Sequence, residues 1–493
     1  MAKQRVHSHS VDIGAIANRS VIEAGFEPRF NSEVLQQVQT IVASPPSMDS
    51  SESIRDLRKL QWSSIDNRES RDLDQLEFAE QLAGGETRLL IAIADVDAFV
   101  PQGSAIDRHA SHNSVSVYTG VRTFPMLPEE LSTDLTSLIP AHDRLTVVTE
   151  MLVAADGKVT SVKIYRAVVR SQAKLSYESV GQWLDGKGEM PQKIAEVPGL
   201  DAQVKLQFET ANRLADVRAQ QGALEFGTIQ ANPVVNDQGK VTELAVVEPN
   251  GARELIASFM IAANVAMATF LEAAGRSSLR RVVRTPKYWS RIVEIAEDLG
   301  EKLPREPDSL ALAEFLQRQK AADPERFADL SLAVVKSLGP GEYAVETPGS
   351  EGEGHFGLAV QDYTHSTAPN RRYPDLVMQR LVKALLENKP APYENAELQE
   401  IAAHCNQRGD AARKVERKMR KVAAAVLLQD RIGHEFSAIV TGATEKGTFA
   451  RLISPPVDGR VVRGQRGLRV GDKTRVRLMS TEPERGFIDF ARA

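Results

Sequence analysis

Three aspartates lie close together near residue 70, and their type and spacing suit the binding of a divalent cation. They are Asp66, Asp72 and Asp74. Asp72 and Asp74 are two residues apart, so in an extended segment both carboxylates point to the same face. Carboxylate oxygens are hard ligands that favour Mg²⁺ or Mn²⁺ over zinc. The alternative is a solvated acidic loop, which is the common state of an isolated pair of this kind.

Two adjacent arginines form a second candidate group much further along the chain. Arg371 and Arg372 lie between two prolines and shortly before Asp375. A guanidinium group offers planar, paired donors that fit the oxygens of a phosphate. Either arginine could instead form an ion pair with Asp375 or Glu387. The segment therefore predicts a phosphate clamp, with a structural ion pair as the alternative.

Length, charge and cysteine content limit the classes of protein. A chain of 493 residues predicts about three domains. The net charge of -5 argues against a uniformly basic surface, so contact with nucleic acid would need a local patch or channel. Cys405 is the single cysteine, which excludes an internal disulfide and a four-cysteine zinc site. The N-terminal segment has no apolar stretch typical of a signal peptide, so we expect a cytoplasmic protein.

One uncharged run, residues 255–271, approaches the length of a membrane span. It contains Ser258, Asn264 and Thr269 and is rich in alanine. A span prefers about 20 strongly apolar residues, and this run is shorter and more polar. We therefore predict a buried helix and no membrane partner, with a membrane segment as the alternative.

The N-terminal part, residues 1–60, is predicted to be helical and to form a small domain. Apolar residues recur there at helical spacing until the segment around Pro45 and Pro46 breaks the pattern. Two or three short helices could form a helix-turn-helix-like module. They could equally be a packing or dimerisation element.

The remainder of the chain predicts an α+β domain followed by a small barrel. Between residues 61 and 430, short apolar runs at 89–96, 146–153 and 159–169 predict strands, and longer helix-like segments follow them. Residues 431–493 contain five short strand-like segments, a number typical of a five-stranded OB-type barrel. Phe436 and Phe449 alternate there with arginines, which suits the stacking of bases and contact with a nucleic-acid backbone.

Five motifs occur along the chain in a fixed order. They are Asp66-x5-Asp72-x-Asp74, Ile93-Ala94-Asp95-Val96, Pro125-Met126-Leu127-Pro128-x2-Leu131-Ser132, His355-Phe356-Gly357-Leu358 and Arg371-Arg372-Tyr373-Pro374-Asp375-Leu376. Together these segments resemble the ribonuclease II and ribonuclease R exoribonucleases, whose catalytic RNB domain carries them in this order. The resemblance covers residues 61–430, with the OB-type module after it.

The resemblance implies hydrolysis of single-stranded RNA from its 3′ end, releasing nucleoside 5′-monophosphates with Mg²⁺, or Mn²⁺ in its place. Asp72, Asp74 and Arg371 match catalytic positions of the family. The family's metal positions correspond to Asp66, Asp72, Asp74 and Gln75. The RNA-binding residues implied by the resemblance, together with those expected in the barrel, are Tyr118, Tyr177, Arg372, Phe436 and Phe449.

The chain departs from the family pattern at several positions. Gln75 stands where the family has a fourth aspartate, and a neutral carbonyl is a weaker Mg²⁺ ligand than a carboxylate. Ala257 and Ser258 stand where the family usually has acidic residues. The helical N-terminal part replaces the paired cold-shock barrels of the family. Two alternatives follow: an RNA-binding protein with impaired catalysis, and a nucleic-acid-binding regulator that acts through the N-terminal helices.

Overall fold

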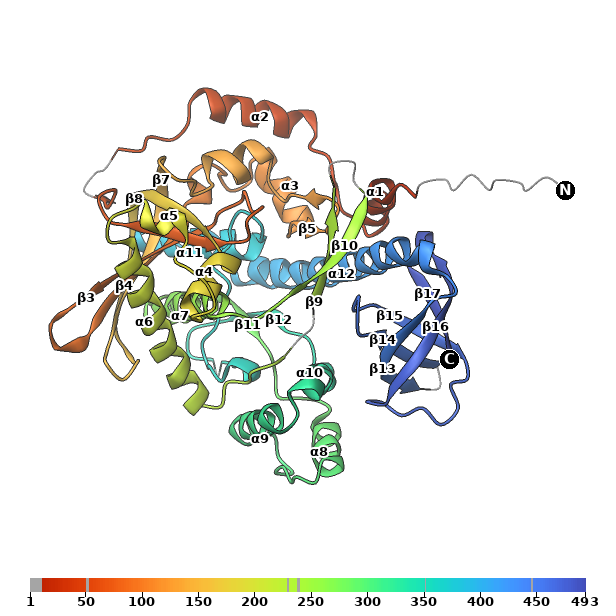
Figure 1. Ribbon diagram of the computed structural model, residues 1–493. Coiled ribbons are helices and arrows are strands. Elements are labelled where there is room, and N and C mark those ends of the chain that lie inside the picture. Colours follow the sequence, from red (N-terminus) through yellow and green to blue (C-terminus); the bar gives the residue numbers. More distant parts are fainter. Residues whose placement is uncertain (1–10, 50–52, 228–229, 237–239, 351, 445–446) are drawn as a thin grey trace.

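A computed structural model describes residues 11–49, 53–227, 230–236, 240–350, 352–444 and 447–493. It combines N-terminal helices, a large mixed domain built on a curved sheet, and a closed C-terminal barrel (Figure 1). The predicted α+β class and the five-stranded barrel are confirmed. Residues 1–10, the start of the predicted N-terminal domain, lie outside the described part of the chain.

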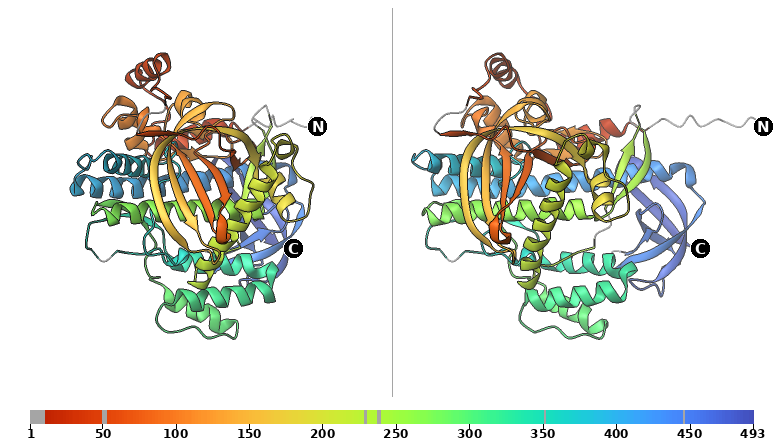
Figure 2. Two further views of the ribbon diagram at one scale, coloured as in Figure 1. Left: turned by 90° about the vertical axis from the view of Figure 1, so that its left-hand side faces the viewer. Right: turned by 60° about the vertical axis from the view of Figure 1, so that its left-hand side comes forward.

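A six-stranded sheet forms the centre of the large domain, in the order β1-β8-β2-β3-β4-β7. β8 also pairs with β7, so the strands curve round on themselves (Figure 2). The three strands predicted from sequence overlap β4, β7 and β8. The strands of this sheet are β1 (Ile54–Asp56), β2 (Trp62–Asp66), β3 (Gln75–Gln81), β4 (Thr87–Ala94), β7 (Asp143–Val153) and β8 (Val159–Ser176).

Alternate side chains of β4 face two different hydrophobic cores. Leu90 and Ala92 face a core shared with α11 (Tyr373–Leu386), whereas Ile91 and Ile93 face a core shared with α6 (Leu200–Gln220) and α7 (Gly251–Ala273). Residues on neighbouring strands that pair directly lie on the same face. Gln75 pairs with Ile93 and Glu77 pairs with Ile91, so both polar residues of β3 face the α6 and α7 side.

The uncharged run near residue 260 forms α7, and its apolar side chains pack inside the protein. Within the described residues α7 is the one helix that is long and apolar enough to cross a membrane, and 61% of its apolar window is buried. Leu255 and Phe259 are fully buried against α6, α4 (Tyr177–Leu184) and the sheet. This burial agrees with the prediction of a core helix.

The two N-terminal helices contribute to different cores. α1 (Ile13–Glu23) packs against α12 (Asn395–Leu428), and α2 (Ser32–Ala43) packs against α3 (Ala105–Asn113). Asp12 and Asn31 cap the helices by accepting hydrogen bonds from main-chain N–H groups of the first turn. This arrangement matches the packing element considered from sequence and differs from a compact helix-turn-helix unit, which would require the two helices to pack on each other.

A single long helix connects the large domain to the barrel. The C-terminal end of α12 contributes Ala425 and Leu428 to the barrel core, and the barrel lies at that end of the helix, away from the curved sheet (Figure 1). The barrel closes in the order β13-β14-β15-β17-β16. Its strands are β13 (Glu435–Thr444), β14 (Gly447–Leu452), β15 (Asp458–Arg463), β16 (Lys473–Glu482) and β17 (Phe487–Arg492).

Smaller elements surround the sheet. Three helices with their own core lie below α7 in Figure 1, and three short strand pairs connect the larger elements. The three helices are α8 (Trp289–Asp298), α9 (Ser309–Ala322) and α10 (Pro324–Leu338), and the strand pairs are β5 (Val117–Tyr118) with β6 (Thr123–Phe124), β9 (Gln230–Val235) with β10 (Val241–Val247), and β11 (Ser278–Val282) with β12 (Glu342–Glu346). A fourth short helix, α5 (Gln192–Ala195), packs with α6.

Candidate active site

A cavity of about 450 Å³ lies where β2 ends and β3 begins. Because these strands pair in the sheet, the loop between them returns the chain to the same edge. The structure brings to this cavity all four predicted metal residues, the predicted phosphate-binding arginine and two predicted RNA-binding tyrosines. These seven residues are Asp66, Asp72, Asp74, Gln75, Tyr118, Tyr177 and Arg371.

Asp74 is the most deeply buried carboxylate of the three predicted aspartates, with 2% of its surface exposed. The main-chain N–H of Asn370 donates a hydrogen bond to its Oδ1 at 3.1 Å, and Arg371 Nε lies 3.3 Å from its Oδ2. Burial raises the pKa of Asp74 to about 7, although the positive charge of Arg371 opposes the shift. One guanidinium therefore does not fully compensate this buried carboxylate.

Asp72 is held by a tyrosine on a neighbouring element. The hydroxyl of Tyr118 donates a hydrogen bond to Asp72 Oδ2 at 2.7 Å, and the main-chain N–H of Tyr118 donates to Glu416 Oε1 on α12 at 3.1 Å. β5 and α12 thus fix the tyrosine from both sides. One oxygen of Asp72 is oriented, and the other remains available to a ligand in the cavity.

Asp66 and Gln75 contact each other across the end of the β2–β3 pair. Gln75 Nε2 donates a hydrogen bond to Asp66 Oδ1 at 3.3 Å, and the buried Oδ2 of Asp66 has no hydrogen-bond partner. Burial raises the pKa of Asp66. Gln75 therefore supports Asp66 through its amide group and adds no charge to the site.

The donor set of this cavity fits a divalent cation. Three carboxylates face it, and within the described residues Arg371 is the one basic side chain in an ion pair with any of them. Two other cations have partners elsewhere: Arg253, which also lines the cavity, forms an ion pair with Glu178 at 3.1 Å, and Lys174 donates to the main-chain carbonyls of Arg68 and Ser70. Hard oxygen ligands with excess negative charge suit Mg²⁺ or Mn²⁺.

A tighter group of carboxylates lies elsewhere and has a structural role. Oxygens of Glu272, Glu346 and Asp362 lie within 4.8 Å of one another. The buried guanidinium of Arg280 lies among them, at 3.4, 2.8 and 3.8 Å respectively. Because Arg280 already supplies a positive charge, this group is an ion-pair cluster around a buried arginine and not a candidate metal centre.

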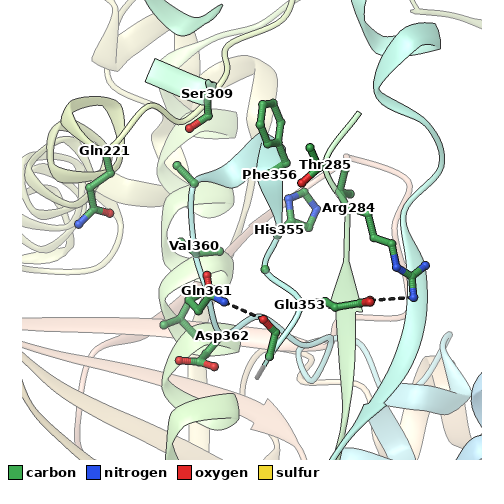
Figure 3. A pocket seen from close by; sticks show the side chains of 15 residues that line it. Gln221, Arg284, Thr285, Ser309, Glu353, His355, Phe356, Val360, Gln361 and Asp362 are labelled. Atoms are coloured by element: carbon green, nitrogen blue, oxygen red, sulfur yellow. Dashed lines mark hydrogen bonds and ion pairs between the residues drawn. The ribbon is translucent and has the colours of Figure 1, made fainter. Parts of the chain in front are cut away.

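A separate open cleft of about 970 Å³ lies beside the His355 motif (Figure 3). Arg284 forms an ion pair with Glu353 at 2.7 Å at its edge. His355 Nδ1 accepts a hydrogen bond from the main-chain N–H of Leu358 at 3.1 Å, and burial lowers the pKa of His355 to about 4. The imidazole is therefore neutral at physiological pH and caps a turn.

The two adjacent arginines have different environments. The side chain of Arg371 is 43% exposed and borders the cavity. Arg372 Nη2 donates a hydrogen bond to Asp375 Oδ1 at 2.6 Å, and the main-chain N–H of Ala368 donates to the same oxygen at 2.8 Å. The side chain of Asp375 is fully buried. Arg372 thus forms a structural ion pair, which was the alternative to phosphate binding, and this ion pair stabilises the turn that carries Arg371. Its predicted contact with RNA stays a prediction.

The other predicted RNA-binding residues lie in two places. Tyr177 begins α4 beside Asp66, and the guanidinium of Arg253 lies 4.4 Å from the centre of its ring. Phe449 on β14 is 38% exposed, whereas Phe436 on β13 packs against the barrel core. Neither phenylalanine lines the carboxylate cavity. Their contact with RNA stays a prediction.

Sequence reasoning missed Glu77, a fully buried carboxylate on the same face of β3 as Gln75. Its exposed fraction is 0%, and neither of its side-chain oxygens has a hydrogen-bond partner. Burial raises its pKa well above the usual value, and the charge of Asp66 adds to the shift. The signal that the sequence offered for Glu77 was an acidic residue within the apolar run from Leu76 to Ala79.

Comparison with known proteins identifies two matched regions. A model of the RNB domain matches residues 54–388, and a model of the RNase II-type exonuclease C-terminal S1 domain matches residues 434–493. Ribonuclease R 1 of Lactococcus lactis is 31% identical over 433 residues, covering 86% of this chain and 52% of the relative. Ribonuclease R of Escherichia coli is 31% identical over 478 residues, covering 88% of this chain and 57% of the relative. The chain thus spans about half the length of the curated relatives it matches.

Among solved structures, ribonuclease R of Mycoplasma genitalium in complex with ribose-methylated single-stranded RNA has a similar fold. Its TM-score is 0.86 at 24% sequence identity, and the match covers 98% of this chain and 78% of that chain. At this identity the likeness shows the fold alone. The similarity extends through both the large domain and the barrel.

Proposed function

The chain belongs to the RNB-domain family of RNase II-type exonucleases, and we propose that it hydrolyses single-stranded RNA from the 3′ end and releases nucleoside 5′-monophosphates. The observation that carries the proposal is the cavity in which Asp66, Asp72 and Asp74 meet with Arg371 as their one ion-pair partner. A cation and a guanidinium can each offset the negative charge that develops on a phosphodiester during hydrolysis.

Asp66, Asp72 and Asp74 are the residues that would hold Mg²⁺, or Mn²⁺ in its place. When bound, the ion supplies Lewis acidity and makes water a better nucleophile near neutral pH. The carboxamide oxygen of Gln75 is a weaker, neutral ligand. Tyr118 orients Asp72, and Asn370 orients Asp74 through its main-chain N–H.

Arg371 is the residue that would bind the phosphate of the terminal nucleotide. Its Nε contacts Asp74, so its two terminal nitrogens are free of that contact and its side chain is partly exposed toward the cavity. A guanidinium can donate two parallel hydrogen bonds to phosphate oxygens. Arg371 would therefore connect Asp74, a proposed ligand of the ion, to the phosphate that is cleaved.

The walls of the cavity suit an unpaired base. Tyr177 lies on one wall beside Ala257 and Met260 of α7, which together offer an aromatic ring and an apolar surface. A base must be unpaired to stack on such a ring, and stacking binds any base without reading its sequence. An adjoining cavity of about 680 Å³ shares Asp72 and Tyr118 with the first and offers a path for the strand.

The reducing cytoplasm is the proposed compartment of this activity. Cys405, the single cysteine of the sequence, is buried beside Ser114 and forms no disulfide. Neither its burial nor its isolation requires an oxidising environment.

A comparison of linear and circular RNA tests the direction and end-dependence of hydrolysis. With Mg²⁺, a linear single strand labelled at its 5′ end should shorten progressively, and chromatography should detect nucleoside 5′-monophosphates. A circle of the same sequence should survive because it has no 3′ end. Cleavage of the circle at a similar rate would replace this proposal with an endonuclease.

Gln75 favours one second candidate, an RNA-binding protein with impaired catalysis. The amide of Gln75 replaces a carboxylate of the family pattern and leaves the site with fewer charged ligands. In that case linear RNA should bind to the protein, and the label should stay at full length with Mg²⁺ or Mn²⁺.

A further inference from the structure

Glu77 is a carboxylate without a visible partner at the centre of the α6 and α7 side of the sheet. The contrast with Glu150 on β7 is direct. Glu150 is also buried, and its Oε2 contacts Arg88 at 3.0 Å and the hydroxyl of Tyr165 at 2.6 Å. Within the described residues, Glu77 has no ion pair, and both its side-chain oxygens lack a hydrogen bond.

Several other buried oxygens near Glu77 are also unpaired. Ser63 pairs with Glu77 across the β2–β3 ladder, so their side chains leave the sheet on the same face. Gln207 of α6 donates its Nε2 to the main-chain oxygen of Glu77 at 3.4 Å. The oxygens without a hydrogen-bond partner include Ser63 Oγ, Asp66 Oδ2, Glu77 Oε1, Glu77 Oε2 and Gln207 Oε1.

All of these groups are oxygen acceptors, or hydroxyls that can act as acceptors. Leaving a buried acceptor unpaired destabilises the folded protein, and a charged group does so more strongly. A buried charge is retained when it is paired or binds a metal ion. An apolar side chain at residue 77 would pack against Ile91 and the α7 core without that cost.

We propose that Glu77 is the fourth carboxylate of the metal centre, and that it binds a divalent cation together with Asp66, from a buried position two residues beyond Gln75 on β3. Glu77 would replace the charge that Gln75 lacks. The two residues are neighbours on one face of β3, and the longer side chain of glutamate can reach back along that face. The inference rests on the proposed function only in that both require a cation.

Equilibrium binding of Mn²⁺ to the full chain without RNA tests this proposal. Electron paramagnetic resonance or calorimetry would give the affinity and the number of ions. Glu77→Gln should weaken Mn²⁺ binding by about 10–100-fold or remove one ion. Unchanged affinity and stoichiometry in a folded Glu77→Gln protein would overturn the proposal.

Glu80→Gln is the matched control, because Glu80 lies on the same strand, is exposed and pairs with Arg88 at the surface. It makes the same chemical change and should leave Mn²⁺ binding unaltered. Gln75→Asp in the Glu77→Gln protein should restore most of the lost affinity, because it returns a carboxylate to the cavity wall. Failure of that restoration in a folded double variant would count against a shared ion.

Glu77→Met provides a second variant that should fold even if Glu77→Gln does not. It removes both oxygens and offers an apolar side chain of similar length to the α7 core. In the presence of a chelator it should melt at or above the temperature of the unsubstituted protein, while binding Mn²⁺ at least tenfold more weakly. Equal Mn²⁺ binding would overturn the proposal.

The binding experiment is independent of RNA degradation. If the protein binds Mn²⁺ through Glu77 and RNA stays at full length, the proposed function fails and the metal site stands. If RNA shortens and Glu77→Gln binds Mn²⁺ normally, the proposed function stands and the assignment of Glu77 fails.

Discussion

Two groups of buried carboxylates lie on either side of the end of β4, and they differ in the cations around them. Asp95 follows the strand and contacts Lys383 at 2.7 Å and Arg166 at 3.2 Å. Asp97 shares Lys383 at 2.7 Å and also contacts Arg380 at 2.9 Å. We call these residues the Asp95 network. On the other side, the main-chain oxygen of Asp74 accepts a hydrogen bond from the main-chain N–H of Ala94, and the side chain of Asp74 forms an ion pair with Arg371.

The pKa shifts of Asp97 and Asp74 have opposite directions. Burial raises the pKa of Asp97, yet Lys383 and Arg380 together lower it below the usual value. Burial raises the pKa of Asp74 to about 7, because Arg371 alone does not offset it. The same residue type is thus compensated at Asp97, whose side chain is 19% exposed, and under-compensated at Asp74, whose side chain is 2% exposed. A deficit of positive charge, rather than the convergence of acids, identifies the candidate metal centre.

Asp74→Asn should have the largest effect on activity and a small effect on folding. Loss of this carboxylate should slow Mg²⁺-dependent shortening of RNA by on the order of 10²–10³-fold. The neutral amide keeps the shape of the side chain and removes an under-compensated buried charge, so the melting temperature in chelator should not fall. Single-turnover rates and thermal melts measure both. If Asp74→Asn unfolds the protein, Asp74 has a structural role like that of the Asp95 network.

Asp95→Asn should have the opposite effect. It leaves Lys383 and Arg166 buried with fewer partners, so the free energy of unfolding should fall by about 3–5 kcal/mol. Urea denaturation measures the loss. The folded fraction should still shorten RNA, since the Asp95 network does not line the cavity. Normal stability with lost hydrolysis would reverse the comparison between the two groups.

Acidic pH should weaken metal binding through Asp74. Below pH about 7 a proton competes with the ion for this carboxylate, so Mg²⁺ affinity should fall by about tenfold per pH unit. Without metal, the folded chain holds this proton more tightly than the unfolded chain does. The contribution of Asp74 to the free energy of unfolding in chelator should therefore decrease as pH rises from about 4 to about 7.

Asp74→Asn provides the control for the pH effect, because it removes the titrating carboxylate. The variant should lose that pH-dependent part of stability in chelator. A slope equal to that of the unsubstituted protein would attribute the proton to another group.

Tyr118→Phe should give the smallest change. It removes the hydrogen bond to Asp72 and keeps the aromatic ring. A net loss of about 1 kcal/mol corresponds to roughly a fivefold reduction in hydrolysis rate or metal affinity. Titration of Mg²⁺ against the rate separates the two effects. An unchanged titration curve would show that Asp72 needs no orienting partner.

The sequence predicted the main groups of the site because their chemistry is local. Asp66, Asp72 and Asp74 occur within one short segment, and the type and neighbours of Arg371 suggested a phosphate contact. The structure does bring these residues to one cavity. The three-part fold followed from periodicity and from the short strands of the barrel, which depend on neighbouring residues.

Contacts between distant segments could not be read in the same way. Asp95 belongs to a motif of the resemblance, yet its partners lie on β8 and α11, so its structural compensation appears only in three dimensions. Whether α1 and α2 pack on each other depends on α12 and α3, which supply their surroundings. The burial of Glu77 depends on α6 and α7.

The most direct test is a time course on 5′-labelled single-stranded RNA with Mg²⁺, with a chelator, and with the chelator followed by excess Mg²⁺. The account predicts progressive shortening with Mg²⁺, arrest in the chelator and recovery when the ion is returned. Shortening at an equal rate in the chelator would contradict a metal centre at Asp66, Asp72 and Asp74. RNA that stays at full length in all three samples would contradict the hydrolytic function itself.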